Sequence, residues 1–227
     1  MYQNNIWVII MAYEKLYNEI YAIVSLKYLW KEYKAYFVKN ESPDWINENM
    51  NLGLEVTQAL LPDDGKTESF IEKYLGCLKE ELPSTAIEFY GDRLYFYNGR
   101  FWAVINDERH PQDYIEKVKF RFDKKLEKLN TNYHHMENNG IYIYVHPAKD
   151  EKVDAKKIYH YIQKEQLKKK VGFKWVFLNC VDSIYVLNFE QETIEKIELP
   201  ENAEYLFDVE TEKLRHSCSW PDGSCLK

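Results

Sequence analysis

The chain has 227 residues, of which 45% are hydrophobic and 16% aromatic, and its formal net charge is −7. This length suits one large domain, or one domain with an appended piece, and the aromatic-rich composition is that of a globular protein. The acidic balance excludes a surface that binds nucleic acid indiscriminately, because such a surface needs a broad excess of lysine and arginine; local basic patches are compatible with it.

The first predicted elements are a short apolar segment and a long helix. Residues 6–12 lack a basic leader and are too few to cross a bilayer, so we expect no membrane anchor there. From about 12 to 38, apolar residues such as Leu16 and Ile23 recur at helical spacing, which predicts one long helix. Glu19 lies at the margin of this apolar stripe.

The segment 42–60 reads SPDWINENMNLGLEVTQAL and offers two carboxylates to one place. Asp44 follows a proline, and Glu55 interrupts an apolar strand predicted over 52–60, where an ionised acid is costly unless it is paired or holds a metal. If residues 47–51 form a hairpin loop, the two acids meet and make an oxygen-rich site of the kind that Mg²⁺ accepts. In the structural alternative, Asp44 caps a turn and Glu55 pairs with a lysine.

A helix is predicted next, over about 68–81, followed by a meander of three antiparallel strands over about 86–106. The segment AIEFYGDRLYFYNGRFWAVI alternates apolar and polar residues, and Asn98-Gly99 suits a tight hairpin turn. Its arginine and aromatic side chains could form a nucleic-acid surface, or the aromatic residues could simply fill strands. These side chains are Arg93, Tyr95, Tyr97, Arg100 and Trp102.

A basic helix is predicted from about 110 to 136, with lysines around an apolar stripe. Lys125 and Lys128 flank that stripe. The adjacent His134 and His135 cannot readily bind one ion, because neighbouring side chains diverge by about 100° on a helix.

Beyond Gly140, which is predicted to end this helix, we expect a strand over 141–146, a helix over 155–170, and two strands over 175–180 and 184–189. With the strand that carries Glu55, these elements predict a mixed α/β sheet flanked by helices.

The four cysteines indicate a reduced, soluble, cytoplasmic protein, because none forms a CxxC pair. Cys180 lies in an apolar run that is typical of a buried thiol. His216, Cys218 and Cys225 could hold a metal, but the polar segment 211–227 is more typical of a flexible tail. The rest of the chain, 1–210, is predicted to form a single domain.

The string PDW…LGLEVTQAL resembles the core motif of the PD-(D/E)xK, or restriction-endonuclease-like, superfamily, and more narrowly small bacterial members with a PD…GIEVT.A signature. The likeness continues through KKLEKLNTNY at 124–133 and KWVFLNCVDSIYVLNF at 174–189, so it covers about 14–189. It implies a restriction-endonuclease-like α/β fold, a mixed central sheet flanked by helices, with the antiparallel meander as an insertion.

The resemblance also implies a nuclease that hydrolyses phosphodiester bonds with Mg²⁺ or Mn²⁺, in a setting such as phage defence or a mobile element. Asp44, Glu55 and the carbonyl of Val56 would hold the metal. A helix acid would support it; Glu19 is the best match, and the alternatives are Glu14 and Glu32. Nucleic acid is then the expected partner, with a second copy of the chain as a possible homodimer partner.

The chain departs from the family pattern at Thr57, where the motif has its lysine. In relatives a neighbouring helix can supply this lysine, and Lys125 is the best match here, with Lys128 second. Its role would be to steady the attacking water and the charge growing on the phosphate. Gln58 is expected to face away from Glu55 and so to be a poor substitute. The alternative is a catalytically inactive binding or immunity-type protein that keeps the fold without the chemistry.

Overall fold

The computed structural model describes residues 15–29, 37–59, 62–104, 114–131, 136–145 and 148–217. These residues divide into two compact units. Residues 62–104 belong to the inserted unit, so named because in the sequence it interrupts the second, which we call the sheet unit. One domain was expected over 1–210; the described residues form two units, each with its own hydrophobic core.

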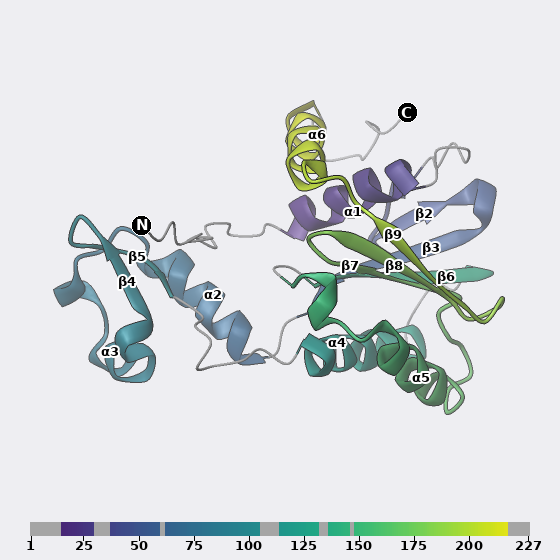
Figure 1. Ribbon diagram of the computed structural model, residues 1–227, viewed down its shortest axis with the longest axis horizontal. Coiled ribbons are helices and arrows are strands. Elements are labelled where there is room, and N and C mark those ends of the chain that lie inside the picture. The colour runs from purple at the N-terminus through teal and green to yellow at the C-terminus, as the bar shows by residue number, and fades with distance from the viewer. Residues whose placement is uncertain are drawn as a thin grey trace. The chain divides into compact units, whose positions relative to one another are not determined.

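The sheet unit is built on a seven-stranded mixed sheet with the strand order β1-β2-β3-β6-β7-β8-β9 (Figure 1). Its strands are β1 (Val38–Lys39), β2 (Trp45–Asn47), β3 (Leu52–Gln58), β6 (Asn138–Tyr144), β7 (Trp175–Asn179), β8 (Ser183–Asn188) and β9 (Thr193–Glu198). Neighbours are antiparallel from β1 to β3 and from β7 to β9, whereas β3, β6 and β7 run parallel. Parallel neighbours need a crossover connection, and the inserted unit lies in the one between β3 and β6.

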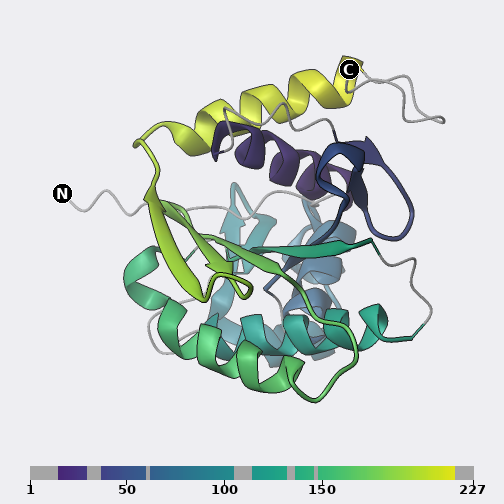
Figure 2. The ribbon, with the colours of Figure 1, turned by 90° about the vertical axis from the view of Figure 1, so that its right-hand side faces the viewer.

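Helices cover both faces of this sheet (Figures 1 and 2). They are α1 (Lys15–Leu29), α4 (Tyr114–Leu129), α5 (Ala155–Gln166) and α6 (Ala203–Ser217). α4 and α5 lie side by side on one face, whereas α1 lies on the other face and α6 packs against α1. The arrangement is the mixed α/β class that the sequence predicts.

The predicted alternation of side chains along β3 is confirmed. Ile141 and Ile143 of β6 belong to the core cluster to which α4 and α5 contribute. In the parallel register Glu55 lies beside Ile141 and Thr57 beside Ile143, so both face α4. Gln58 therefore points to the opposite face, as expected.

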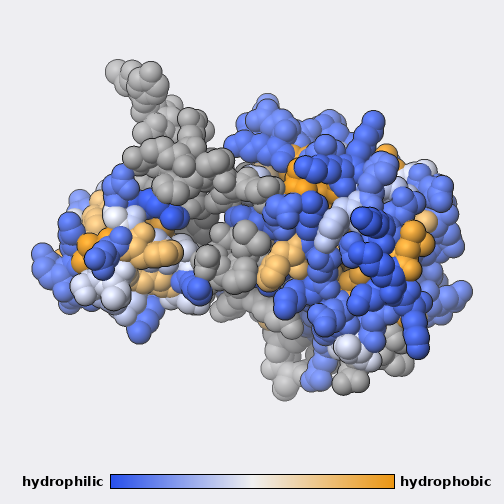
Figure 3. Space-filling view, turned by 90° about the horizontal axis from the view of Figure 1, so that it is seen from below, coloured by the Kyte–Doolittle hydropathy of each residue, from blue (hydrophilic) through white to orange (hydrophobic). Residues whose placement is uncertain are grey.

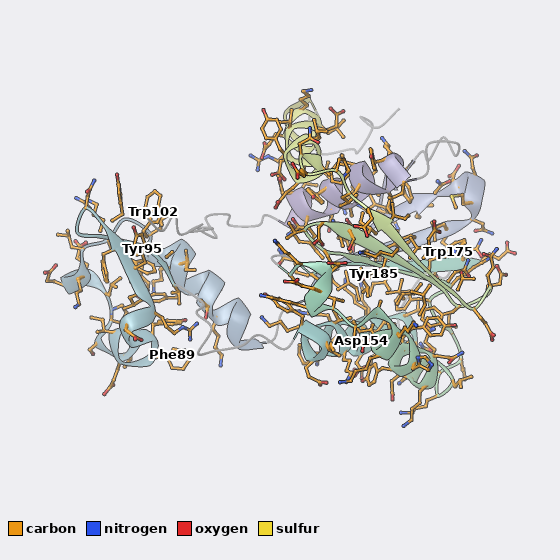
Figure 4. All side chains as sticks on the ribbon, in the orientation of Figure 1. Phe89, Tyr95, Trp102, Asp154, Trp175 and Tyr185 are labelled. Atoms are coloured by element: carbon orange, nitrogen blue, oxygen red, sulfur yellow. The ribbon has the colours of Figure 1, made fainter. Side chains whose placement is uncertain are left out.

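The basic helix is confirmed as α4, and its apolar stripe is buried. The buried side chains are Val118, Phe122, Leu126 and Leu129, three or four residues apart. The outer surface of α4 and α5 is largely hydrophilic (Figure 3). α5 begins at the predicted residue, where the Asp154 carboxylate accepts a hydrogen bond from the Lys157 amide and caps the helix (Figure 4).

Several helix ends differ from the prediction. The helix expected over 68–81 is Pro62–Tyr74, α4 ends at Leu129 rather than near 136, and α5 ends at Gln166 rather than at 170. The first helix is α1 and ends at Leu29 within the described residues; 30–36 lie outside them, and Val38 already belongs to β1. Gly140 does not end a helix but lies inside β6, where an added Cβ would stand 3.3 Å from side-chain carbons of Leu52 and Leu54. The small residue there makes room for its strand neighbours. His134 and His135 lie outside the described residues.

The C-terminal part of the sheet unit was not predicted. β9 follows β8 through a turn in which Glu192 has a φ of 55°, and α6 then packs on α1 with Phe207 buried against Tyr21. The predicted tail is wrong for 211–217, because these residues belong to α6 and Thr211 is fully buried. The side chain of His216, and Cys218 and Cys225, lie outside the described residues.

Over its described residues, 62–104, the inserted unit contains two helices and one hairpin. They are α2 (Pro62–Tyr74), α3 (Ser84–Tyr90), β4 (Leu94–Tyr97) and β5 (Arg100–Val104). Short 3-10 turns lie at Lys79–Glu81 and Gly91–Arg93 here, and at Glu48–Met50 and Asp150–Lys152 in the sheet unit. The core of the inserted unit is aromatic: Phe101 is fully buried, and its ring centroid lies 5.2 Å from that of Phe70.

The predicted meander over 86–106 is half right. The β4–β5 hairpin is confirmed, and both Asn98 and Gly99 have the positive φ angles, 50° and 74°, that its tight turn needs. The first expected strand is instead α3, which starts directly after Pro83. Pro83 is the N-cap residue, and its carbonyl accepts the first hydrogen bonds of the helix from the amides of Ala86 and Ile87, so a helix start prevailed over the strand-like alternation.

Candidate active site

The β2–β3 hairpin brings the two acids of the motif together. β2 pairs with β3 so that Trp45 lies opposite Leu54 and Asn47 opposite Leu52. The predicted loop between them is confirmed as a 3-10 turn whose last residue, Asn51, is left-handed with a φ of 47°. Asp44 directly precedes β2 and Glu55 lies on β3, each one residue beyond the Trp45–Leu54 pair, and each is only 1% exposed.

Gly53 makes the close approach of the motif segments possible. A Cβ on Gly53 would stand 2.7 Å from Cγ of Pro43 and 3.0 Å from Cγ of Met136. Real Cβ atoms do not come that close to carbon atoms of a rigid ring, so the proline can lie over β3 only where a glycine is present. Pro43 directly precedes Asp44. The contact between Gly53 and Pro43 therefore fixes the position of Asp44 beside β3.

Asp44 is held by the backbone of β3. Its Oδ2 accepts a hydrogen bond of 2.8 Å from the amide of Val56, just past the last β2–β3 pair at Leu54. The N–H and C=O groups of one strand residue point to the same edge of the strand, so the carbonyl of Val56 faces the side on which Asp44 lies. The structure thus directs a carboxylate and a main-chain carbonyl to one edge of β3.

Glu55 is bound by two lysines of α4. Lys125 Nζ donates to its Oε2, and Lys128 Nζ donates to its Oε1 at 2.9 Å. Lys125 Nζ also lies 3.9 Å from Oδ2 of Asp44, so this one ammonium group stands between the two acids. The lysine side chains are 20% and 42% exposed, respectively.

The two lysines decide the charge of Glu55. Burial by itself would raise the pKa of this carboxyl, but the charges and hydrogen bonds of Lys125 and Lys128 outweigh burial and hold the pKa of Glu55 below its ordinary value. Glu55 is therefore ionised at neutral pH although it is almost completely buried. A buried acid in this state can serve as a ligand or as an electrostatic partner.

Glu19 takes a different place from the one expected. It lies on α1, which covers the face of the sheet opposite to α4, and its Oε2 is 2.6 Å from Lys39 Nζ. Lys39 also donates to the main-chain carbonyl of Asp44 at 3.2 Å. The structure therefore links Glu19 to the motif through Lys39, a residue that the sequence analysis missed and that no motif spacing indicates. The alternatives Glu14 and Glu32 lie outside the described residues.

The residues at this hairpin offer one set of donors for a divalent cation, and it includes a main-chain carbonyl. Within the described ranges, no three Asp, Glu, His or Cys side chains are grouped closely enough to hold a metal. Two carboxylates and a main-chain carbonyl are nevertheless a hard, all-oxygen donor set of the kind Mg²⁺ takes together with water. Asp44 and the carbonyl of Val56 lie at one edge of β3, and Glu55 shares Lys125 with Asp44, so a cation held by all three would have to share or replace the lysine contacts of Glu55.

The lysine pair belongs to a longer basic row on α4. Lys117, Arg121, Lys125 and Lys128 are spaced by four, four and three residues, which places them on one flank of the helix. The other flank faces α5: Tyr161 donates to Asp123 at 2.6 Å, and Lys119 Nζ lies 5.0 Å from the ring centroid of Tyr161. Lys125 and Lys128 were predicted as site residues from the sequence, and the spacing of the four basic residues was the signal for the row.

The inserted unit carries the predicted aromatic surface in part. The ring centroids of Tyr97 and Trp102 lie 6.0 Å apart on the β4–β5 hairpin, which also carries Tyr95 (Figure 4). Arg100 donates to the carbonyl of Gly76 at 2.7 Å, and the Arg93 guanidinium lies 5.8 Å from the ring centroid of Tyr90. Both arginines therefore contact their own unit, and a nucleic-acid surface here stays a prediction.

Cys180 is a buried thiol, as expected. Burial raises the pKa of Cys180 to about 12, so this thiol is neutral at physiological pH. In the part of the chain that the structure describes, no helix combines the length and the apolar character needed to span a bilayer.

Comparisons with known proteins identify no family for this chain. No family model matches it, and no solved structure matches it. Among curated proteins it is similar to Protein TIC 214 of Adiantum capillus-veneris, with 32% identity over 88 residues, or 36% of this chain. The chain spans only 5% of the length of that relative, so this similarity shows neither a family nor a function.

Proposed function

We propose that the sheet unit is a metal-dependent nuclease of the PD-(D/E)xK type and that Asp44, Glu55 and Lys125 form its catalytic site. The observation that carries this proposal is the position of Lys125. The motif strand has Thr57 where a lysine would be, and Lys125 of α4 instead places an ammonium group on Glu55 and 3.9 Å from Asp44. An acid pair with a shared lysine is the arrangement that the resemblance implies.

Each group has a role that follows from its contacts. Asp44, Glu55 and the carbonyl of Val56 would hold Mg²⁺ or Mn²⁺, which when bound supplies a Lewis acid and lowers the pKa of a water ligand. The Val56 amide orients Asp44 through a 2.8 Å hydrogen bond. Lys125, between the two acids, is placed to donate to the phosphate oxygen that gains negative charge during attack by water.

The fold and the basic row support the same proposal. The sheet unit is a mixed sheet flanked by helices, which is the architecture that the resemblance implies. The inserted unit lies in the crossover that leads from β3 to α4, where an insertion leaves the hairpin intact. Arg121, one helical turn from Lys125 on α4, adds a further positive charge near the site, which suits a polyanionic substrate.

The same contacts favour one alternative, a nuclease-fold protein that binds a partner without catalysis. Both oxygens of Glu55 accept from lysines, and Oδ2 of Asp44 accepts from the Val56 amide. Two acids and two lysines make an electrically balanced cluster that is stable without a metal. An ion-pair cluster of this kind can be retained for structure alone.

Metal binding and cleavage measured together separate the two functions. We expect Mg²⁺ or Mn²⁺ to raise the melting temperature and to support cleavage of DNA or RNA by the wild-type chain. Asp44→Asn keeps the hydrogen bond to the Val56 amide but weakens a hard-cation site, so it should lose both effects while remaining folded. A wild-type chain that shows neither a metal-induced shift nor cleavage of any single- or double-stranded substrate would favour the binding protein.

A further inference from the structure

The two lysines on Glu55 are not equivalent. Lys125 is the less exposed, at 20%, and also lies 3.9 Å from Asp44. Lys128, one helical turn further along α4, is 42% exposed and contacts the other oxygen of Glu55 at 2.9 Å. The ammonium group of Lys125 therefore lies between the two acids, whereas that of Lys128 covers Glu55 on its more exposed side.

The charges of the four side chains Asp44, Glu55, Lys125 and Lys128 balance before any cation binds. Asp44 and Glu55 contribute two negative charges, and Lys125 and Lys128 contribute two positive charges. A divalent cation added to this set would give a net charge of about +2 and would place an ammonium group and a metal on the same carboxylate. Repulsion between the two cations then favours the departure of one lysine.

We propose that Lys128 is a displaceable counter-ion, which occupies Glu55 in the absence of metal and which the divalent cation replaces. This inference rests on the proposed metal-dependent function and assigns Lys128 a role in regulating metal binding rather than a catalytic one. Lys128 leaves more readily than Lys125 because its half-exposed side chain can return its charge to water at little cost. Lys125 stays between the acids, where its partial burial and its second acidic neighbour hold it.

The exchange has a consequence for the substrate. With Mg²⁺ bound and Lys128 withdrawn, two carboxylates, one divalent cation and Lys125 leave a net charge of about +1. A phosphodiester carries one negative charge, so its arrival restores neutrality in a largely buried site. Without metal the four side chains sum to zero and have little attraction for a phosphate, so phosphate binding is favoured only once the cation has replaced Lys128.

The test is a Mg²⁺ titration of full-length variants, followed by calorimetry and by the melting temperature. Lys128→Ala should bind Mg²⁺ roughly fivefold more tightly than the wild type, because a half-exposed ion pair no longer competes for Glu55. Lys128→Arg keeps the competing charge and should bind like the wild type. Lys124→Ala is the matched control: it removes an exposed lysine of the same helix and should change the affinity by less than about twofold.

Three outcomes would overturn the inference while leaving the metal site in place. They are equal affinities of Lys128→Ala and Lys124→Ala, weaker binding by Lys128→Ala, and tighter binding by Lys128→Arg than by the wild type. Lys128→Gln, which keeps the stem and a polar end, repeats the comparison if the alanine variant fails to fold. Absence of Mg²⁺ binding from every variant, Lys128→Ala included, would instead overturn the proposed function itself.

Discussion

The two hairpins β2–β3 and β4–β5 differ in the burial of their candidate functional residues. In β2–β3 the functional candidates are acids that are 1% exposed and held by groups from other elements, the amide of Val56 and two lysines of α4. In β4–β5 the candidates are aromatic residues at the surface, of which Tyr97 is 57% exposed. Buried charge needs specific partners, and exposed aromatic area does not. The difference therefore marks β2–β3 as the region where a substitution should affect chemistry.

The largest expected effect is on cleavage, through Lys125. Lys125→Met keeps the length of the side chain but removes the charge between the two acids, so cleavage should fall by about 10³-fold. Lys124→Met, on the exposed side of the same helix, is the control and should retain activity. Turnover of a fluorescent oligonucleotide measures both. Equal activity of the two variants would mean that the ammonium group has no catalytic role.

A core substitution in the inserted unit should lower the stability of that unit without changing metal binding. Phe101→Ala removes a fully buried ring that lies 5.2 Å from Phe70, and it should destabilise this unit by about 3 kcal/mol. The sheet unit has its own core, so the Mg²⁺-induced change at the hairpin should survive. Denaturant unfolding followed in parallel with the Mg²⁺ titration tests this. Loss of metal binding in Phe101→Ala would show that the two units depend on each other.

The two hairpins each need a glycine for a different reason: Gly53 because there is no room for a Cβ, and Gly99 because of its backbone conformation. Gly53→Ala would push Cβ to 2.7 Å from Cγ of Pro43 and should cost about 2 kcal/mol together with most of the activity, because the proline positions Asp44. Gly99→Ala meets no atom within 4 Å, but its φ of 74° is strained for alanine, so it should cost about 1 kcal/mol and leave activity unchanged. Urea unfolding and the cleavage assay are the measurements. A larger loss of activity in Gly99→Ala than in Gly53→Ala would contradict this expectation.

The smallest expected effect is the pH dependence that Glu55 contributes. The pKa of Glu55 is lower in the folded chain than in the unfolded one, so its stabilisation is fully present above the ordinary glutamate pKa of about 4.3. It is lost as the pH falls through the lower, folded-state pKa. The free energy of unfolding of Glu55→Gln should therefore vary less with pH below about 4 than that of the wild type. An identical pH profile for both chains would contradict the assigned shift.

Much of the local structure was predictable because it depends on residues close in sequence. The alternation along β3, the loop at 47–51 and the Asn98-Gly99 turn follow from the strand period and from turn residues, and all three are confirmed. The apolar stripe of α4 follows in the same way from the helical period. The prediction failed at α3, where helix and strand preferences compete. It also failed at Gly140, because a glycine can either end a helix or, as here, lie within a strand.

By itself the sequence determined that an acid would be buried on β3, that a second acid would lie across a hairpin from it, and that a lysine-rich helix would follow. The resemblance pointed to Lys125 and Lys128, but that both bind Glu55, one on each oxygen, was decided only by the tertiary structure, because they are 70 and 73 residues away. The same holds for the pairing of Glu19 with Lys39. Local periods fix which face a side chain takes, but its partner depends on how the crossover through α4 brings a distant helix onto the sheet.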